Sequence, residues 1–276
     1  MVVTRKAYSS DLTRNQFKRL SSLLPAALPG GRPRSVDLFE ILNAILYVLR
    51  NGCVWRDLLA HKTAPDGLFA LPHDLPPWPT VYAYKRRFER DGSWAAINRI
   101  LLRQTRRAAG RDPEPSAAIV DSQSVRCSPQ AGVRGVDAGK KTNGRKRHVL
   151  VDTLGLLLLV IVTAASVQDR DGAKLVFGRA RTRYPRLALV WADGGYAGQL
   201  VEWTKTVCRW VLEIVKRTDD LKGFKVLPRR WVVERSLAWY TRCRRLTRDY
   251  EGRAETTESW VYLASIQLML RRLDPS

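Results

Sequence analysis

The sequence predicts a helical N-terminal part followed by an α/β domain. Three observations lead to this prediction. Apolar residues recur at helical spacing over much of the first 108 residues, short runs of β-forming residues follow residue 116, and helical patterns separate the later runs. The proline-containing stretch GRDPEPSA lies between the two patterns. We therefore expect two domains, residues 1–115 and residues 116–276.

The clearest helical pattern of the N-terminal part is RSVDLFEILNAILYVLR, which Ser35 can cap and Gly52 ends. The amphipathic VWRDLLA follows at once, so the sequence predicts two helices joined by a tight turn, as in a helix-turn-helix. An αα-hairpin that only packs is equally compatible with this pattern. Residues 64–79 hold five prolines and are expected to be irregular, whereas helices are expected over 81–92 and 94–108.

The second part contains five runs rich in β-forming residues. They are AAIVDSQSV, HVLVDT, LLLLVIVTAA, LALVWA and WVLEIV. The first three come in succession, whereas helical segments separate or follow the others. This order predicts a mixed five-stranded sheet with helices on its faces.

The chain is strongly basic. Its 276 residues include 48 Lys and Arg but 26 Asp and Glu, a formal net charge of +22. Such a field attracts polyanions, and nucleic acid is the leading candidate partner. No apolar run approaches the roughly 20 residues of a membrane-spanning helix. Because the N-terminus also lacks the apolar core of a signal peptide, we expect a cytoplasmic protein with no membrane partner.

Cysteines, histidines and serines show no recognisable catalytic or metal-binding pattern. Cys53, Cys127, Cys208 and Cys243 form no C-x-x-C pair, and the three histidines are isolated. No serine lies in a nucleophile-elbow context. Zinc sites, disulfides and serine catalysis are therefore not expected, and any chemistry must use carboxylates.

Three acidic residues occupy positions suited to catalysis. Asp121 interrupts the first apolar strand, Asp193 follows the fourth in VWADGGYAG, and Glu234 opens the last predicted helix. Ligands of open α/β sheets gather at strand ends, which is where Asp193 is expected. Rival acids of this half, which a turn and a helix cap explain, are Asp152, Asp169 and Asp171.

The last predicted helix, RRWVVERSLAWYTRCRRL, spans residues 229–246 and carries six arginines and one acid, Glu234. Arg230 lies one turn before Glu234, so a surface ion pair contributing about 0.3–0.5 kcal/mol explains the acid without chemistry. Alternatively, Glu234 binds a metal ion while the arginines bind DNA. On a continuous helix Arg230, Glu234 and Arg245 share the face opposite the apolar side chains.

The order of several blocks resembles a known family. IVDSQSV, GKKTNGRKRHVLVDTLGLLL, ASVQDRDGA, WADGGYAG and VERSLAWYTRCRRLTRDYE resemble the Asp-Asp-Glu (DDE) transposases of bacterial insertion sequences, most closely the insertion-sequence-five family, over roughly residues 20–270. The resemblance implies a ribonuclease H-like catalytic domain in which the first and fourth strands are neighbours. It identifies Asp121 and Asp193 as the catalytic aspartates and Glu234 as the catalytic glutamate.

The resemblance also implies cofactors and partners. Three clustered carboxylates suit Mg²⁺ or Mn²⁺, and two such ions about 3.5–4 Å apart activate an attacking hydroxyl and stabilise the leaving oxygen. The partners are double-stranded transposon ends and target DNA, bound by a homodimer or higher oligomer at the bacterial nucleoid. Arg230, Arg242 and Arg245 are the expected phosphate contacts of the last helix. Leu227 and Thr241 stand where the wider family has a tyrosine and a lysine.

A basic stretch follows the first strand. Residues 126–147, RCSPQAGVRGVDAGKKTNGRKR, include seven basic residues, one acid and four glycines. They show no apolar periodicity, so a solvated, disordered excursion is one interpretation. Because this stretch leaves the strand that carries Asp121, we favour a DNA-clamping loop that orders on binding. The residues expected to contact DNA there are Lys140, Lys141, Arg145, Lys146 and Arg147.

Two other functions are compatible with the residues. A ribonuclease H-like nuclease or resolvase shares the acids but cuts without joining, and a non-catalytic DNA-binding regulator shares the charge but needs no acids at the sheet. The resemblance favours a DNA transposase that binds the terminal inverted repeats of an insertion sequence and catalyses metal-dependent cleavage and strand transfer.

Overall fold

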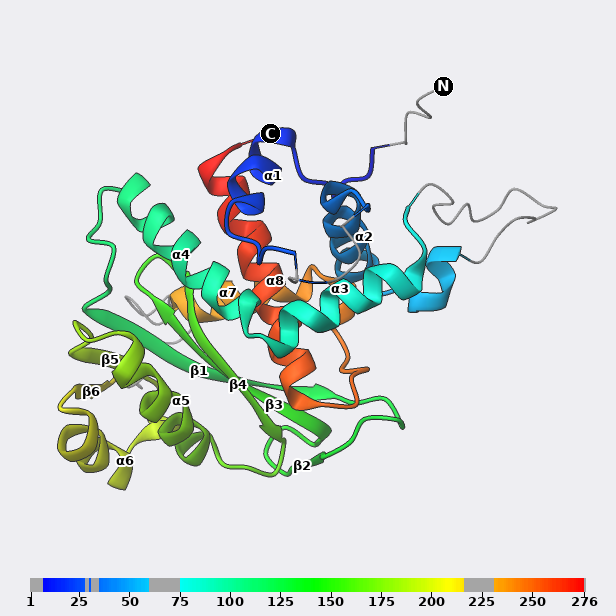
Figure 1. Ribbon diagram of the computed structural model, residues 1–276. Helices are drawn as coiled ribbons and strands as arrows, with labels where there is room; N and C mark the ends of the chain where they lie inside the picture. Colours follow the sequence, from blue (N-terminus) through cyan, green and yellow to red (C-terminus); the bar gives the residue numbers. More distant parts are fainter. Residues whose placement is uncertain (1–6, 28–29, 31–34, 60–74, 216–230, 276) are drawn as a thin grey trace, which may run out of the picture.

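A mixed β-sheet forms the second half of the chain (Figure 1), in a computed structural model that describes residues 7–27, 30, 35–59, 75–215 and 231–275. The strands are β1 Ala117–Arg126, β2 Gly135–Asp137, β3 Thr142–Asp152, β4 Leu157–Ala164, β5 Leu189–Ala192 and β6 Val211–Ile214. Five of them follow the order β4-β3-β1-β5-β6, and the short β2 extends the sheet beside the first residues of β3. Because β1 is antiparallel to β3 and parallel to β5, the sheet is mixed, as the sequence predicts.

Helices cover both faces of this sheet. Those of the second half are α5 Asp169–Arg183, α6 Gln199–Trp203, α7 Trp231–Thr241 and α8 Ala254–Leu273, with single turns at Gly194–Tyr196, Thr204–Cys208 and Arg244–Leu246. Gly172 of α5 packs on the ring of His148, where any side chain would collide. The preceding residue of β3, Arg147, points to the opposite face and donates to the carbonyl of Leu246, in the 3-10 turn that follows α7.

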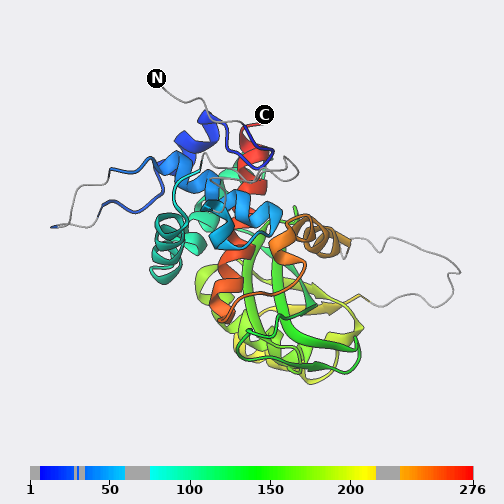
Figure 2. The same ribbon diagram turned by 90° about the vertical axis from the view of Figure 1, so that its right-hand side faces the viewer.

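Helix α8 joins the sheet to the N-terminal helices (Figure 2). These helices are α1 Arg14–Ser21, α2 Leu38–Asn51, α3 Trp78–Arg90 and α4 Ser93–Ala108. Helix α8 packs against α4 and β4 above all, and it also contacts α1, α2 and α3. Its side chains are buried on nearly every side, including Trp260, Ile266 and Leu270. None of the described helices has the length and apolar character needed to cross a membrane.

Polar contacts also fasten α4 to the turn between β3 and β4. Asn98 donates to the carbonyl of Leu157 (2.8 Å), and Arg106 forms a buried ion pair with Asp152. Asp152 accepts two further hydrogen bonds from backbone N–H groups of the turn, which confirms its expected turn role. One apolar core therefore runs through both parts of the chain. The assignment of separate functions to residues 1–115 and 116–276 stays a prediction.

The expected helix-turn-helix is not confirmed. Helix α2 forms as predicted, but Asp37 caps it in place of Ser35, accepting a hydrogen bond from the backbone N–H of Phe39 (2.8 Å). Gly52 ends the helix in the left-handed region with φ 70°. Within the described residues only the 3-10 turn Trp55–Leu59 follows, in place of a second helix. The end of VWRDLLA and most of the proline-rich segment lie outside those residues.

The basic stretch 126–147 is largely β-structure, contrary to the expectation of a loop. Strand β3 begins at Thr142, six residues before the predicted run HVLVDT, and β2 pairs with its first residues. Gly144 allows this, because a side chain there would begin 1.9 Å from the carbonyl oxygen of Val125. The sheet therefore has six strands instead of five.

Helix α7 is shorter than predicted. It ends at Thr241, and a separate 3-10 turn covers Arg244–Leu246. The chain has already left the helix at Arg242, so Arg242 and Arg245 do not continue the face that carries Glu234. The prediction that Arg245 shares the helical face of Glu234 is wrong, whereas Arg230, predicted on the same face, lies outside the described residues.

Stability should depend on pH through Glu258 of α8, which accepts a hydrogen bond from the backbone N–H of Val162 (2.9 Å). Burial raises the pKa of Glu258 from 4.5 to about 7. Between these values the folded protein holds a proton that the unfolded chain has lost, so stability falls as pH rises from about 4.5 to 7, by up to about 3 kcal/mol. Glu258→Gln should flatten this fall and be more stable than wild type at pH 8. Urea unfolding across this pH range measures the effect.

The exposed neighbour Glu255 provides the control. Glu255→Gln should keep the fall with pH and shift it slightly to lower pH, because the charge of Glu255 adds to the effect of burial on the pKa of Glu258. A Glu258→Gln profile parallel to that of the wild type would show that Glu258 does not hold the proton.

Candidate active site

Asp121 and Asp193 lie at matching positions on neighbouring strands. Strands β1 and β5 are parallel, and Ile119 pairs with Trp191. Two residues further along each strand, the two aspartates therefore come side by side, with backbones about 5 Å apart and side chains on the same face. The expectation that the first and fourth predicted strands are neighbours is confirmed.

Local hydrogen bonds hold both aspartates. The backbone N–H of Ser122 donates to Oδ1 of Asp121 (2.7 Å). Asp193 begins the 3-10 turn Gly194–Tyr196, and its Oδ1 accepts from the backbone N–H of Gly195 (2.9 Å). A side chain at Gly195 would begin 3.1 Å from that oxygen, so the glycine keeps the approach to the carboxylate open.

The carboxylates converge around Tyr196, which is buried at the end of this turn. Burial raises the pKa of the Tyr196 hydroxyl well above its usual value, and the negative charges of Asp121, Asp169 and Asp193 raise it further. A phenol that senses three carboxylates lies within short electrostatic range of all of them. Tyr196 therefore lies near an acidic cluster of Asp121, Asp169 and Asp193, beside the middle of β1 and the end of β5.

Asp169 is the member of this cluster that sequence reasoning assigned to a structural role. It is the first residue of α5, and its Oδ1 accepts from Oγ of Ser122 (2.8 Å) and from Nζ of Lys146 (2.9 Å). Burial acts to raise the pKa of Asp169, but these two donors outweigh it, so the pKa is lowered. The block ASVQDRDGA contains Asp169 and was the signal that could have identified it.

Glu234 lies on the exposed side of α7, opposite the buried Val232 and Val233, as predicted. Helix α7 packs against β1, the strand that carries Asp121. Among the described residues, however, no three His, Cys, Asp or Glu side chains form a group that could hold a metal ion. The structure thus brings the two aspartates together but does not gather Glu234 with them into a three-carboxylate group.

Several basic residues predicted to contact DNA are buried instead. Arg145, Lys146 and Arg147 are 1%, 5% and 2% exposed. The ammonium group of Lys146 bridges Asp137 (3.2 Å) and Asp169 (2.9 Å). Arg147 donates to the carbonyl of Leu246 (2.8 Å). Lys146 neutralises two carboxylates and Arg147 donates to a backbone carbonyl, so both cations are engaged within the fold and lie outside the proposed DNA interface.

The same holds for Arg145 and Arg245, which secure the segment after α7. Arg145 pairs with the buried Asp249 (3.3 Å), and Arg245 pairs with Glu251 (2.7 Å). Arg245 is 8% exposed and also donates to the carbonyl of Cys53 (3.2 Å). Helix α7 ends at residue 241, and the chain after it returns toward the sheet. This return brings Asp249 to Arg145 and buries Arg245 beside Glu251.

The remaining predicted DNA contacts differ in their placement. Lys140 and Lys141 are exposed at the turn between β2 and β3, and Arg242 is exposed after α7. The ammonium of Lys140 donates to the carbonyl of Ser122 (3.2 Å), which places its charge beside Asp121. Arg230 lies outside the described residues.

Comparison with known proteins identifies the family. Residues 112–269 match the model of the transposase DDE domain, and residues 12–67 match a model described as "Putative transposase of IS4/5 family". The chain is a DDE transposase. A protein of Burkholderia cepacia described as "Putative transposase for insertion sequence element IS402" is 28% identical over 158 residues, which are 54% of this chain and 74% of that relative. The expected class, a DDE transposase of an insertion sequence, is confirmed.

Membership decides between the functions that the residues left open. DDE transposases use divalent metal ions in general, and such ions prefer oxygen ligands. The family match favours a transposase over a DNA-binding regulator and over a nuclease that only cuts.

Removing Arg145 should destabilise the transposase without changing its affinity for DNA. Arg145→Met leaves Asp249 buried without its counter-charge, so the free energy of unfolding should fall by about 3–5 kcal/mol. Denaturant unfolding and DNA titration measure the two effects. Arg253→Met, at an exposed site nearby, should change stability by less than about 0.5 kcal/mol. Unaltered stability combined with weaker DNA binding would return Arg145 to the DNA interface.

Proposed function

We propose that Asp121, Asp193 and Glu234 are the catalytic carboxylates with which this transposase cuts and joins DNA at the ends of an insertion sequence. The observation that carries the proposal is the parallel register of β1 and β5, in which Ile119 pairs with Trp191, so that Asp121 and Asp193 each follow a paired residue by two positions. Two acids at that spacing repel each other unless a cation neutralises them, which is costly for a purely structural pair. Helix α7 supplies Glu234 from the element packed against β1.

We infer that the sheet is of the ribonuclease H-like type. Its order β4-β3-β1-β5-β6, with three antiparallel strands followed by parallel ones, supports this inference. The arrangement matters for chemistry because it places the middle of the central strand β1, where Asp121 lies, beside the end of β5. Both aspartates would then face one opening at the carboxyl end of β5, where ligands of such sheets bind.

The carboxylates would hold Mg²⁺ or Mn²⁺, most simply as two ions. A bound ion of this kind activates an attacking hydroxyl and stabilises the leaving oxygen at phosphorus. The chain's own residues position these acids. Ser122 and Gly195 donate backbone N–H groups that fix the orientation of Asp121 and Asp193. Lys140 adds a positive charge beside Asp121, where it attracts the DNA phosphate.

Three variants test this assignment. Asp121→Asn, Asp193→Asn and Glu234→Gln keep side-chain shape but remove charge, so each should lower single-turnover cleavage and strand transfer by about 10²-fold or more while DNA binding is largely kept. Duplexes carrying the terminal inverted repeat serve as substrate, with Mg²⁺ or Mn²⁺ for chemistry and Ca²⁺ for binding. Joined product with a pre-cut 3′-hydroxyl end separates strand transfer from hydrolysis.

Asp171 provides the matched control, since its side chain is 59% exposed in the same helix as Asp169. Asp171→Asn should cut and join normally. Strand transfer that persists in any of the three variants would remove that residue from the catalytic set, and full activity in excess chelator would exclude metal catalysis.

We further propose that residues 1–115 recognise the terminal inverted repeats. Two observations support this proposal. Residues 12–67 match a separate family model, and residues 1–115 carry an excess of positive charge, with 19 basic against 10 acidic residues. The transposase would hold two ends in a homodimer or higher oligomer, on DNA in the cytoplasm. Because the N-terminal helices share their core with α8, the test requires the full chain.

Hydroxyl-radical footprinting of the full chain on duplex DNA tests end recognition. A duplex carrying the inverted repeat should protect exposed positions such as Lys18, Arg56 and Arg90 more than random duplex does. Binding should also weaken steeply as salt rises. Protection confined to residues 116–275 would contradict the proposal.

A further inference from the structure

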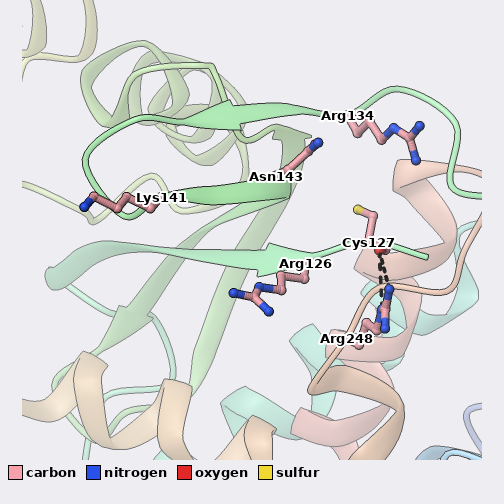
Figure 3. Close-up of a pocket in the computed structure, with 6 residues that line it drawn as sticks. All are labelled: Arg126, Cys127, Arg134, Lys141, Asn143 and Arg248. Atoms are coloured by element: carbon pink, nitrogen blue, oxygen red, sulfur yellow. Dashed lines mark hydrogen bonds between the residues drawn. The ribbon is translucent and has the colours of Figure 1, made fainter. Parts of the chain in front are cut away.

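A groove with basic walls lies between the end of β1 and the β2–β3 hairpin (Figure 3). Its lining residues are Arg126, Cys127, Arg134, Lys141, Asn143 and Arg248. A second depression adjoins it, shares Arg126 and Arg248, and runs along β1 as far as Gln123. Neither contains an acidic lining residue in the part of the chain that the structure describes.

The four cations of this groove are not neutralised within the described residues. The guanidinium of Arg126 and the ammonium of Lys141 have no hydrogen-bond or ion-pair partner there, and both side chains are exposed. Arg134 and Arg248 donate only to carbonyl oxygens, those of Pro129 and Cys127. Four positive charges around one depression repel each other, so the groove favours an anionic occupant.

Asp137 is the single acid of the hairpin segment 126–147. Its carboxylate is already engaged within the fold, because its Oδ2 accepts a hydrogen bond from Oγ of Ser124 (2.5 Å) and pairs with Nζ of Lys146 (3.2 Å). The buried ammonium of Lys146 thus removes the one negative charge of the hairpin from competition with a bound anion.

The groove is preformed by the backbone. Gly144 holds the hairpin directly against Val125 of β1, since no side chain fits between them. Lys141 adopts φ 48°, the left-handed region that glycine and asparagine prefer. Backbone conformation alone favours Asn or Gly there, so Lys141 adds a cation to the groove at a position where a lysine is conformationally costly.

We propose that this groove binds the sugar-phosphate backbone of the DNA strand that continues from the reacting phosphate. The inference rests on the proposed catalytic role of Asp121, which lies on the same strand. Five residues separate Asp121 from Arg126 along β1, about 17 Å at the rise of an extended strand. For a duplex whose axis runs parallel to β1, that distance spans roughly five base-pair steps of 3.4 Å along the axis. Arg126, Arg134, Lys141 and Arg248 would therefore contact phosphates about five nucleotides from the cut.

Two variants test the groove while sparing the fold. Lys141→Asn removes the charge but suits the left-handed backbone, so its melting temperature should equal or exceed that of the wild type. Arg126→Gln removes an exposed cation without an internal partner. Each should weaken binding of end-containing and random duplex alike and reduce the slope of log K against log salt by about one, or about two in the double variant.

Arg179→Gln, at an exposed site of α5 outside the groove, is the matched control and should leave the slope unchanged. Binding is measured with Ca²⁺, so it does not depend on cleavage. An unchanged slope of log K against log salt in the double variant would overturn the proposal that the groove binds DNA, whatever the activity of the catalytic variants. Normal cleavage by Asp121→Asn would instead overturn the proposed catalytic site, and the salt slopes would still decide whether the groove binds DNA.

Phosphate-ethylation interference identifies the DNA strand involved. If ethylation of phosphates about five nucleotides inside the inverted repeat interferes with binding, the groove contacts the transposon end. If ethylation at the same distance in the flanking or target DNA interferes, the groove contacts the flanking or target DNA. Interference at such a position should disappear in the double variant. Wild-type interference confined to positions next to the cut would contradict the proposed path.

Discussion

Burial of helix α8 is the constraint on which the rest of the structure depends. Its apolar side chains contact both the N-terminal helices and strand β4, so one core stabilises the two parts together. A 20-residue helix that is buried on nearly every side is not stable alone in water. Without α8, the apolar surfaces of β4 and of the N-terminal helices would be exposed to water. The N-terminal helices and the sheet are consequently held in one fixed relation.

Buried cations organise the catalytic side of the sheet in a second way. Lys146 of β3 neutralises Asp137 of β2 and Asp169 of α5, and Arg145 neutralises Asp249 in the segment after α7. Each internal pair is costly to break, because a lone charge in the core has no water to replace its partner. The strong positive charge of the chain is therefore divided between cations that build the fold and exposed cations that are available for DNA.

The division matters for how a basic segment is interpreted. In residues 126–147, pairing of β3 with β1 and β4 turns Arg145 and Arg147 inward, whereas the hairpin turn leaves Lys140 and Lys141 exposed. Neighbours in sequence thus serve opposite purposes. Lys140 approaches the acidic cluster through Ser122, and Lys141 faces the groove at the end of β1. Charge alone cannot distinguish these roles, since all of these side chains are cationic at neutral pH.

The sequence by itself determined five of the six strands, though not the first residues of β3, together with the helices α2 and α4, the family, and Asp121 and Asp193 as candidate site residues. These follow from local periodicity and from residues whose spacing along the chain is sufficient evidence. Only tertiary structure decided that Asp169 joins the acidic cluster, that Arg145 and Arg245 are internal, and that α7 ends before Arg242. Each of those outcomes depends on contacts between residues far apart in the chain, where burial and partner geometry outweigh local propensity.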